Sequence, residues 1–451
     1  MNIIIVGCGK VGTTLLGQLS SEKHNITVID QDPNRISSIT NEFDVMGFCG
    51  NGVSYQTLTE AGIKSCQLLI AVTGSDEQNL LCCMIAKRAT GCKTIAQVRD
   101  PVYASELSFL KDGLELSMII NPANTAADEI ARVFQFPGAL KIDSFSGGRA
   151  ELYHFRVTAE SPLCGHSIMD LRTDYLQNVL VCTVRRGDDA IIPGGRFVFR
   201  ENDTIGVVAS RKDAIRFLKK LGIVSGRVRN ALIVGGGNLS FYLAKRLIGT
   251  GISTTIVDHD FARCEELSGQ LPEATILHGD PTEHTFLDQL RLENYQGFAS
   301  LTGLDEENIL LSLYARTQSD AKIVTKINRI SFRSVISSMD LDTIINPQVL
   351  TADTILKFVR SMNKAAGSNM ESLYTLEDGK AEALEFLINE DSDVTGISLK
   401  DLKLKDNTLI CNIVRNGKSI LPSGNDTLEK GDRVIIVMAN RHISDIREIL
   451  A

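Results

Sequence analysis

One long module occurs twice in this chain, and this duplication constrains the fold more than any other feature of the sequence. NIIIVGCGKVGTTLLGQL begins at Asn2, and its match NALIVGGGNLSFYLAKRL begins at Asn230, 228 residues later. Four further pairs of segments match in the same order: VIDQD with IVDHD, AVTGSDEQNLL with SLTGLDEENIL, MIINPANTAADEI with TIINPQVLTADTI, and IIPGGRFVFRENDTIGVVA with ILPSGNDTLEKGDRVIIVM. Chance likeness between common folding elements does not keep five segments in order at a nearly constant offset. The chain is therefore a tandem repeat.

The first part of each module alternates short apolar runs with helix-like stretches. In module one the predicted strands are Ile3–Val6, Ile26–Ile29, Val45–Cys49, Leu68–Val72, Thr94–Val98 and Ser117–Ile120, and two of the predicted helices are Glu77–Ala89 and Pro101–Leu110. Strands that alternate with helices form right-handed βαβ units and a parallel sheet covered on both faces. The sequence predicts an α/β protein with two Rossmann-like, doubly wound sheets.

A helix is expected after each sheet, because Asn121-Pro122 and Asn346-Pro347 combine a good N-cap with a proline at the first helical position. The first of these helices places Ala126, Ile130, Val133 and Phe134 on one apolar face. That face can pack on its own domain or on another subunit.

The second part of each module is short and rich in strands, which predicts a small α+β domain after each sheet. The predicted domains are residues 1–140 and 229–366 for the two large sheets, and residues 150–222 and 382–451 for the two small domains. FLKKLG and RHISDIREIL are expected to be closing helices. Linkers are expected at Ser144–Arg149, Val224–Arg229 and Ala366–Gly379.

The turn after the first strand fits the pattern G-x-G-x-x-G with Gly7, Gly9 and Gly12. The first glycine allows a sharp turn, the second lets the backbone approach a pyrophosphate, and the third lets the helix lie close to the sheet. The helix N-terminus adds free N–H groups and partial positive charge. Because a strand precedes this turn and a helix follows it, we predict a dinucleotide site in module one.

Asp30 ends the second strand, where a carboxylate accepts hydrogen bonds from an adenosine ribose and repels a 2′-phosphate. NAD(H) is therefore favoured over NADP(H). Asp30 can instead cap the next helix, but Asp32, before Pro33, is better placed for that role.

Thr73 and Gly74 follow the fourth strand, where the sheet order is expected to reverse and ligands bind. Ser75 and Asp76, which come next, are interpreted as helix-capping residues. Arg99 ends the fifth strand at the same edge, where it can contact a phosphate or remain solvated. Lys10, inside the glycine turn, can also neutralise phosphate.

Module two keeps part of this pattern. Gly235 and Gly237 hold the first two glycine positions, and Ser240 replaces the third. Asp258 and Thr302 are kept, Asn328 stands in place of Arg99, and Asp280 stands in place of Asn51. The second site is expected to bind the same nucleotide, a different adenine nucleotide, or nothing.

Composition excludes several functional classes. The net charge of −8, from 47 basic and 55 acidic residues, argues against non-specific binding to nucleic acid. Met1 leads straight into the first strand, and no apolar run is long enough to span a membrane, so a cytoplasmic location is expected. The seven histidines show neither catalytic nor metal-ligand spacing, and none of the common hydrolase or NTPase motifs is present. The bound nucleotide is therefore interpreted as a regulatory ligand, and no metal site is expected.

These motifs together resemble the TrkA family, the cytosolic regulatory subunits of Trk-type potassium uptake systems. The resemblance covers the whole chain and depends on IIIVGCGKVG, VIDQD, AVTGSDEQN, IAQVRDP and INP in module one, and on LIVGGGNLS, IVDHD, LTGLDEEN and INP in module two. It implies tandem regulator-of-potassium-conductance domains. The ligand positions that it implies are Gly7, Cys8, Gly9, Lys10, Val11, Asp30, Thr73, Gly74 and Arg99, and in module two Gly235, Gly236, Gly237, Asn238, Leu239, Asp258 and Thr302. Family members often carry Asp at the position of Asn51, and Asp280 keeps that residue in module two.

The resemblance also implies a peripheral protein on the cytoplasmic face of the membrane, docked on a membrane-embedded potassium-translocating subunit. It implies a homo-oligomer, a dimer or a tetrameric ring, whose geometry responds to NAD(H) or to ATP and ADP. Two other hypotheses remain at this point. One is a soluble NAD-dependent oxidoreductase, and the other is a scaffold with vestigial sites.

Overall fold

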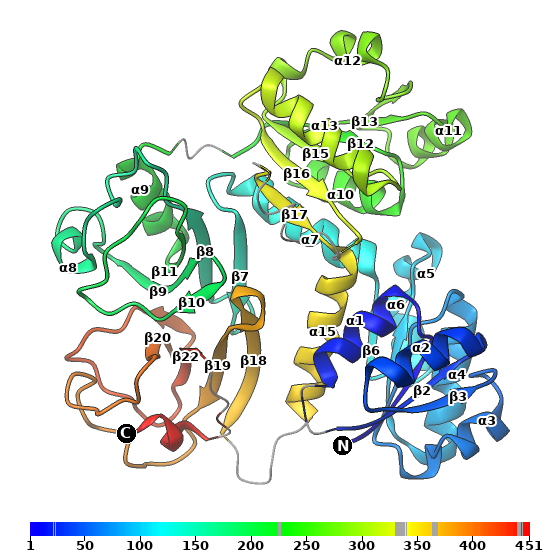
Figure 1. Cartoon of the computed structure of the whole chain (residues 1–451), viewed down its shortest axis with the longest axis horizontal. Coiled ribbons are helices and arrows are strands. Elements are labelled where there is room, and N and C mark those ends of the chain that lie inside the picture. The colour runs from blue at the N-terminus through cyan, green and yellow to red at the C-terminus, as the bar shows by residue number, and fades with distance from the viewer. Residues whose placement is uncertain are drawn as a thin grey trace. The chain divides into compact units, whose positions relative to one another are not determined.

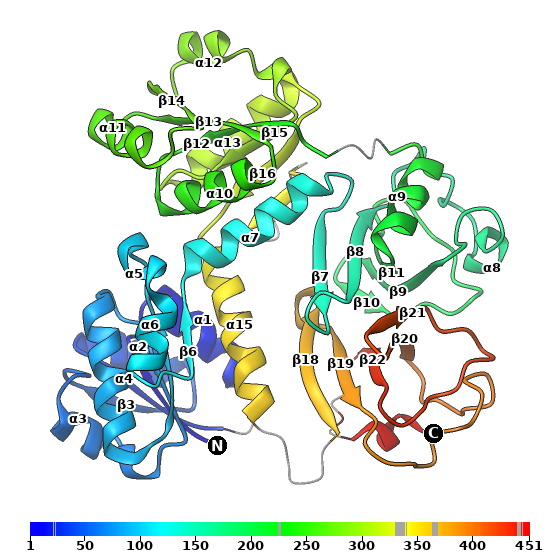
Figure 2. The same ribbon diagram turned by 180° about the vertical axis from the view of Figure 1, so that it is seen from behind.

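Two compact units make up the chain, and each unit contains a segment from both modules. The structure is a computed structural model that describes residues 1–20, 22, 24–223, 227–329, 339, 341–362, 369–439, 443 and 445–451. Unit one comprises Met1–Ala131 and Val228–Leu356, and unit two comprises Arg132–Arg227 and Lys357–Ala451 (Figure 1, Figure 2). The duplicated parts therefore gather by kind, with large domains in one unit and small domains in the other.

Unit one contains two parallel sheets of the same topology. The first domain has strands β1 (Asn2–Val6), β2 (Asn25–Asp30), β3 (Met46–Cys49), β4 (Leu68–Ala71), β5 (Lys93–Gln97) and β6 (Met118–Ile120), in the order β3-β2-β1-β4-β5-β6 over the described residues. The second has β12 (Asn230–Val234), β13 (Ser253–Asp258), β14 (Thr275–His278), β15 (Gly297–Ser300), β16 (Lys322–Lys326) and β17 (Thr343–Ile345), in the order β14-β13-β12-β15-β16-β17. Their paired neighbours run parallel. This confirms the predicted Rossmann-like sheets.

Helices connect these strands (Figure 1). In the first domain they are α1 (Lys10–Leu19), α2 (Pro33–Glu42), α3 (Tyr55–Glu60), α4 (Asp76–Thr90), α5 (Pro101–Ser105), α6 (Leu107–Gly113) and α7 (Pro122–Gln135), with a 3-10 turn η1 (Ile63–Ser65). In the second they are α10 (Asn238–Gly249), α11 (Phe261–Gln270), α12 (His284–Leu290), α13 (Asp305–Gln318) and α15 (Pro347–Met362), with η2 (Leu292–Asn294). The central strands are apolar runs because both of their faces are covered.

One predicted helix is interrupted in the structure. Pro101–Leu110 forms two short helices, α5 and α6, because the chain turns at Glu106. The Glu106 N–H there donates to the carbonyl of Tyr103, three residues back rather than four. The six predicted strands of module one differ from the observed strands by no more than one residue at either end.

The trailing helices pack on the opposite module. On α7, Ala126, Ile130, Val133 and Phe134 are completely buried, as predicted for its apolar face. The polar side of α7 binds α10, where Asn124 Oδ1 accepts a 2.8 Å hydrogen bond from Arg246 Nη2. The sequence left open whether this helix covers its own domain or another subunit, and the structure shows that it contacts the other large domain of the same chain.

The second trailing helix makes the reciprocal contact. Gln18 Nε2 on α1 donates a 2.6 Å hydrogen bond to Asp353 Oδ1 on α15. Each large domain therefore holds the trailing helix of the other.

Unit two contains two antiparallel sheets. The first has β7 (Lys141–Phe145), β8 (Ala150–Arg156), β9 (Val179–Arg186), β10 (Asp189–Ile191) and β11 (Thr204–Ala209), in the order β10-β9-β11-β8-β7, with α8 (Ile168–Leu171) and α9 (Arg211–Lys220). The second has β18 (Met370–Leu376), β19 (Ala381–Leu387), β20 (Thr408–Arg415), β21 (Lys418–Ile420) and β22 (Arg433–Ala439), in the order β18-β19-β22-β20-β21, with η3 (Glu377–Gly379) and η4 (Ile446–Ile449). The predicted strand-rich parts are present, but each sheet includes a strand, β7 or β18, that lies before the predicted bounds of 150–222 and 382–451.

Two of the predicted linkers are wrong over the residues that the structure describes. Ser144–Arg149 is not a linker, because it forms the tight turn between β7 and β8, in which Ser146 adopts a positive φ of 50°. Ala366–Gly379 likewise includes β18 and η3, and only its residues 366–368 lie outside the described ranges. Val224–Gly226 of the remaining predicted linker also lie outside them.

One of the two predicted closing helices is confirmed, and the other is not. FLKKLG ends α9, as predicted. RHISDIREIL provides only the 3-10 turn η4 among its described residues, and residues 441, 442 and 444 lie outside the description. Backbone pairing explains the difference, because the Ile449 carbonyl accepts a hydrogen bond from Lys405 and Leu450 bridges Leu404.

A buried ion cluster joins the two sheets of unit two. His154 on β8 lies with Nε2 2.9 Å from Asp143 Oδ2 on β7 and Nδ1 3.4 Å from Glu377 Oε1 on η3. Lys141 contacts Asp143 at 2.9 Å, and Arg185 on β9 lies 3.9 Å from Glu377. Burial alone lowers the pKa of His154, but the hydrogen bonds and charges of Asp143 and Glu377 outweigh it and raise that pKa above its usual value.

This cluster predicts a loss of stability at alkaline pH. Because the folded-state pKa of His154 is raised, its contribution is present below the unfolded-state pKa and is lost as pH rises through the folded-state pKa. We expect His154→Gln to remove about 1 to 3 kcal/mol near neutral pH and to flatten the alkaline decline. Urea unfolding of the full chain between pH 6 and 9 measures both effects. Equal pH slopes in the wild type and the variant would contradict this role of His154.

Candidate nucleotide site

A cavity of about 660 Å³ opens at the carboxyl ends of the central strands of the first sheet. This volume is within the range of small-molecule sites, and the cavity lies where the strand order reverses between β1 and β4. It brings together these predicted residues: Gly7, Gly9, Lys10, Val11, Asp30, Asn51, Thr73, Gly74 and Arg99. Gly12 and Cys8 do not line the cavity. The Cys8 thiol is buried, and burial raises its pKa to about 12.

The glycine turn has the geometry that its pattern predicts. Gly7 has φ +101°, and a Cβ there would lie 2.8 Å from the backbone nitrogen of Thr73. A Cβ at Gly12 would overlap the carbonyl oxygen of Gly7. Gly9 has no atom within 4 Å of the position of a Cβ, and as the N-cap of α1 it provides no side-chain cap. The first N–H groups of α1 are thus left for an anion.

Asp30 holds this turn against the end of β2. Its Oδ2 accepts a 2.7 Å hydrogen bond from the Cys8 N–H, and its Oδ1 accepts a 2.9 Å bond from the Asp32 N–H. Asp32, not Asp30, caps α2 through a 2.9 Å bond from the Asn34 N–H, as predicted. The Asp30 side chain is about one tenth exposed. Its carboxylate therefore forms part of the cavity wall with lone pairs still available to a ribose.

The end of β4 is held by a buried amide. Asn79 Oδ1 accepts hydrogen bonds from the Thr73 N–H at 2.8 Å and from Thr73 Oγ1 at 2.7 Å. Its Nδ2 donates a 2.9 Å bond to the carbonyl of Gln97, at the end of β5. Asn79 therefore links the ends of β4 and β5 without lining the cavity.

Asp76 has a different role from the predicted one. Ser75 caps α4, as predicted, by accepting from the Gln78 N–H at 3.2 Å. The Asp76 carboxylate does not cap its own helix but accepts from the backbone N–H groups of Arg99 at 2.7 Å and Asp100 at 2.8 Å. The capping prediction for Asp76 is therefore wrong, because this carboxylate anchors the loop after β5.

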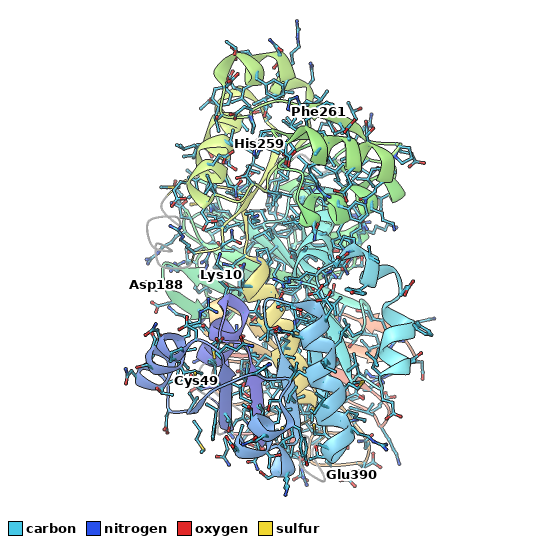
Figure 3. The ribbon with its side chains drawn as sticks, turned by 90° about the vertical axis from the view of Figure 1, so that its right-hand side faces the viewer. Lys10, Cys49, Asp188, His259, Phe261 and Glu390 are labelled. Carbon is cyan, nitrogen blue, oxygen red and sulfur yellow. The ribbon has the colours of Figure 1, made fainter. Side chains whose placement is uncertain are left out.

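Three cations of module one line the cavity, namely Lys10, Arg35 and Arg99. Lys10 is the first residue of α1 (Figure 3), and Arg99 is about two fifths exposed. The Arg99 guanidinium donates to the Gly74 carbonyl and lies 3.5 Å from Asp76 Oδ1, so it lies along the cavity wall. The side chains of Lys10 and Arg99 are placed where a cation can neutralise the charge of a phosphate.

Several lining residues were not identified from the sequence. They are Val6, Ile29, Gln31, Asp32, Arg35, Gly50, Gly52, Val53, Val72, Gln78, Cys82, Gln97, Pro122 and Gln348. Most of them neighbour a predicted residue, so the strand ends themselves were the signal. Gln348 had no such signal, because it belongs to α15 of module two and reaches the cavity through the exchange of trailing helices.

Module two builds the same framework with different contacts. Gly235 has φ +98°, and the carboxylate of Asp258 accepts from the Gly236 N–H, as Asp30 does from Cys8. Ser240 fits the third glycine position because its hydroxyl donates to the Gly235 carbonyl. Gly237 is the N-cap of α10, and Leu239 is buried. The predicted residues of this turn are thus brought together around the end of β12.

The polar residues of module two differ from those of module one in charge. Thr302 is held by Asn308, as Thr73 is by Asn79, with a 2.8 Å bond to the backbone. Asn328 replaces Arg99 and donates from Nδ2 to Asp305 at 2.9 Å. Asn238 replaces Lys10, and its amide lies 3.4 Å from the Arg99 carbonyl of the first domain. Lys10 and Arg99 of the first site are therefore neutral amides in the second, whereas Arg263 matches Arg35 and Lys326 stands in place of Gln97.

The carboxyl ends of β13 and β14, where a ribose is predicted to bind in module two, carry side chains that differ from those of module one. The Asp280 carboxylate is hydrogen-bonded to Thr282, whose N–H and Oγ1 donate to Asp280 Oδ1 at 2.8 and 2.7 Å. His259, beside Asp258 and near Phe261 (Figure 3), has Nδ1 3.5 Å from Asp258 Oδ1. Histidine and aromatic side chains at this edge have no counterpart in module one, where Gln31 and Pro33 stand.

The described ranges contain no cluster of three or more His, Cys, Asp or Glu side chains arranged to hold a metal ion. Nor does any helix within them have both the length and the apolarity needed to cross a membrane.

Comparison with known protein families matches the whole repeat. The TrkA-N domain matches residues 3–122 and 231–347, and the TrkA-C domain matches residues 152–222 and 383–451. The Trk system potassium uptake protein TrkA of Halomonas elongata is 32% identical over 457 residues, which cover 100% of this chain and 98% of that protein. A TrkA homolog of Archaeoglobus fulgidus is 30% identical over 451 residues, with 100% of both chains covered.

Solved structures share the fold at lower identity. The GsuK channel superimposes with a TM-score of 0.64 at 17% identity, covering 97% of this chain and 77% of that chain. A GsuK channel bound to NAD gives a TM-score of 0.62 at 16% identity, with the same coverage. A GsuK structure bound to ADP gives 0.51 at 13% identity, covering 80% of this chain and 70% of that one.

The glycine geometry predicts that two alanine substitutions affect different properties, stability at Gly7 and nucleotide binding at Gly9. Gly7→Ala strains a positive φ and presses a methyl group against the Thr73 backbone, so we expect a loss of about 3 kcal/mol in the free energy of unfolding. Gly9→Ala places its methyl group in open space, so we expect the chain to fold normally and to bind nucleotide more weakly. Thermal unfolding and nucleotide titration of both variants measure this. Equal stability of the two variants would show that the turn is not constrained at Gly7.

Proposed function

Because this chain belongs to the TrkA family of Trk potassium uptake proteins, we propose that it is the nucleotide-sensing regulatory subunit of a membrane-embedded, potassium-translocating partner. The observation that carries this proposal is the cavity at the end of β1, where an uncapped helix N-terminus, Asp30 and three cations converge. This arrangement recognises a ribose and a diphosphate. The family comprises transport proteins, not enzymes, which argues against the alternative of a soluble oxidoreductase.

NAD(H) is the proposed ligand of module one, with ATP and ADP as the alternatives. Asp30 favours an unmodified ribose, which all four nucleotides provide. Lys10 and Arg99 suit a diphosphate or a triphosphate. Structural relatives of the same fold are described as bound to NAD and to ADP.

Module two is proposed to bind a nucleotide with less phosphate charge, or to bind the same one more weakly. Its glycine turn and Asp258 are in place, but Asn238 and Asn328 replace Lys10 and Arg99, which leaves Arg263 and Lys326 as its cations against three in module one. A site with fewer positive charges stabilises a diphosphate less.

The proposed mechanism is a shift of population between conformations of an assembled subunit. A nucleotide changes such an equilibrium only by its differential affinity for the two conformations. In this chain the cavity of module one includes Gln348 on α15, a helix that α1 also binds through Gln18 and Asp353. A nucleotide that contacts both β1 and α15 therefore acts on the packing between the two large domains.

Assembly is proposed to use the apolar surface of the large domains. Leu81 and Met84 lie one turn apart on α4 and are each 42% exposed, and Leu310, which matches Leu81, is 68% exposed on α13. Contiguous exposed apolar side chains of this kind mark protein–protein interfaces. We propose a homo-oligomer, a dimer or a tetrameric ring, that docks on the cytoplasmic face of the membrane through its transport partner alone.

Paired substitutions of the two aspartates test the nucleotide sites. We expect Asp30→Asn to weaken nucleotide binding to module one about 10- to 100-fold, because it removes charge-assisted hydrogen bonds to the ribose while keeping an acceptor for the turn. Asp258→Asn is expected to affect only module two, so each variant is the control for the other. Calorimetric titration with NAD+, NADH, ATP and ADP measures this. No binding of any of the four to the wild type would remove the sensor mechanism.

A flux experiment tests the regulatory role. With the potassium-translocating subunit in vesicles, we expect nucleotide to change potassium flux only when this chain is present. Asp30→Asn is expected to raise the nucleotide concentration that gives half of the flux change. The factor is expected to equal the increase in the dissociation constant, because the flux change follows occupancy of the site. Flux that ignores nucleotide in the presence of the wild-type chain would refute regulation, even if the titration shows binding.

A further inference from the structure

The two small domains of unit two share a core built from equivalent residues. Cys182 on β9 and Cys411 on β20 occupy the same position of the duplicated strand, and both are completely buried. Both thiols belong to one buried apolar cluster. Phe145, Leu152, Leu376 and other apolar residues of both sheets belong to the same cluster. The two domains therefore meet face to face about a local two-fold relation.

The polar contacts on either side of this core are not equivalent. Ser146, in the turn between β7 and β8, corresponds to Glu377 in the turn between β18 and β19, and both have positive φ, 50° and 46°. His154 on β8 corresponds to Glu385 on β19. Each turn meets the strand residue of the other domain. His154 Nδ1 lies 3.4 Å from Glu377 Oε1, and Ser146 Oγ donates a 2.6 Å hydrogen bond to Glu385 Oε1.

Each strand residue also has a partner within its own domain that suits its charge. His154 faces Asp143, whereas Glu385 accepts a 3.2 Å hydrogen bond from the hydroxyl of Tyr374, which holds the equivalent position to Asp143. Arg433 Nε lies 4.0 Å from Glu385 Oε1. The first domain thus presents an imidazole and a hydroxyl, and the second presents two carboxylates.

The carboxylate of Glu377 also depends on the first domain for its remaining partners. Its Oε1 accepts a 2.7 Å hydrogen bond from Thr183 Oγ1, and its Oε2 lies 3.9 Å from Arg185. The equivalent positions of the second domain are Asn412 and Val414, and Val414 has no charge to offer. Glu377 would therefore lose both its cations against a second copy of its own domain.

We propose that these contacts make each small domain select the unlike small domain as its partner. A pair of second domains would place Glu377 against Glu385 twice, and these residues are only 7% and 3% exposed here. A pair of first domains would place His154 against Ser146 and leave the imidazole without Glu377. Buried like charges exclude a partner more strongly than matched contacts attract one. The surface therefore fits the other half of this chain, in the same copy or in another copy that exchanges domains.

A charge placed in the first turn tests this selection. Ser146→Glu gives the first domain the turn residue of the second and sets a carboxylate against Glu385. Glu377 shows that this turn accepts glutamate at the same positive φ. We expect amide hydrogen exchange in β8 and β19 of the full chain to become at least tenfold faster, while exchange in the large domains is unchanged. Ser146→Gln, of matched size without charge, is expected to differ from the wild type by less than threefold.

A second substitution separates charge from shape. Glu385→His in the Ser146→Glu background creates a second copy of the contact between His154 and Glu377, so we expect exchange to return to within threefold of the wild type. The same rescue applies if Ser146→Glu alone prevents folding. Unchanged exchange in Ser146→Glu, equal acceleration in Ser146→Gln, or failure of Glu385→His to restore protection would each overturn the proposal.

Discussion

Two buried side chains, Asn79 and Asp76, fix the chain at the carboxyl ends of β4 and β5, which form one side of the cavity. Asn79 binds the backbone after β4 and the carbonyl of Gln97, while Asp76 accepts two N–H groups of the loop after β5. Parallel strands leave unpaired polar groups at their ends, which need partners when they are buried. Because side chains of α4 supply these partners, the backbone after β4 and β5 is hydrogen-bonded beside the cavity without a further strand.

The second module retains this framework while its ligand-facing residues have changed. Asn308 and Asp305 make the same backbone contacts as Asn79 and Asp76. Lys10 and Arg99 of the first cavity are replaced by amides, one of which, Asn238, binds the carbonyl of Arg99 instead. The duplication thus preserves what the strand ends require and varies what a ligand would contact. This contrast distinguishes the structural polar residues from those available for binding.

The sequence predicts local features of this fold well, because they depend on neighbouring residues. Strand positions, the glycine turn, and the capping roles of Asp32 and Ser75 follow from apolar runs and from side chains one to three residues from their targets. Asp76 was misassigned because its partners lie more than 20 residues away, on the next strand end. The turn at Ser144–Arg149 was interpreted as a linker because its small residues suit either structure. Gln348 was not found because no local pattern indicates that a helix crosses to the other module.

The exchange of trailing helices links the two large domains of unit one. α7 binds α10 through Asn124 and Arg246, and α15 binds α1 through Asp353 and Gln18. Helix α1 begins at the glycine turn of the predicted ligand site. Its other end contacts α15, so α1 connects the two. In the proposed mechanism, a nucleotide at the first N–H groups of α1 therefore acts on the packing of α15, whose Asp353 lies 335 residues after Gln18. The contact of α7 with α10, whose N-cap is Gly237, places the glycine turn of module two in the same relation to a helix of module one.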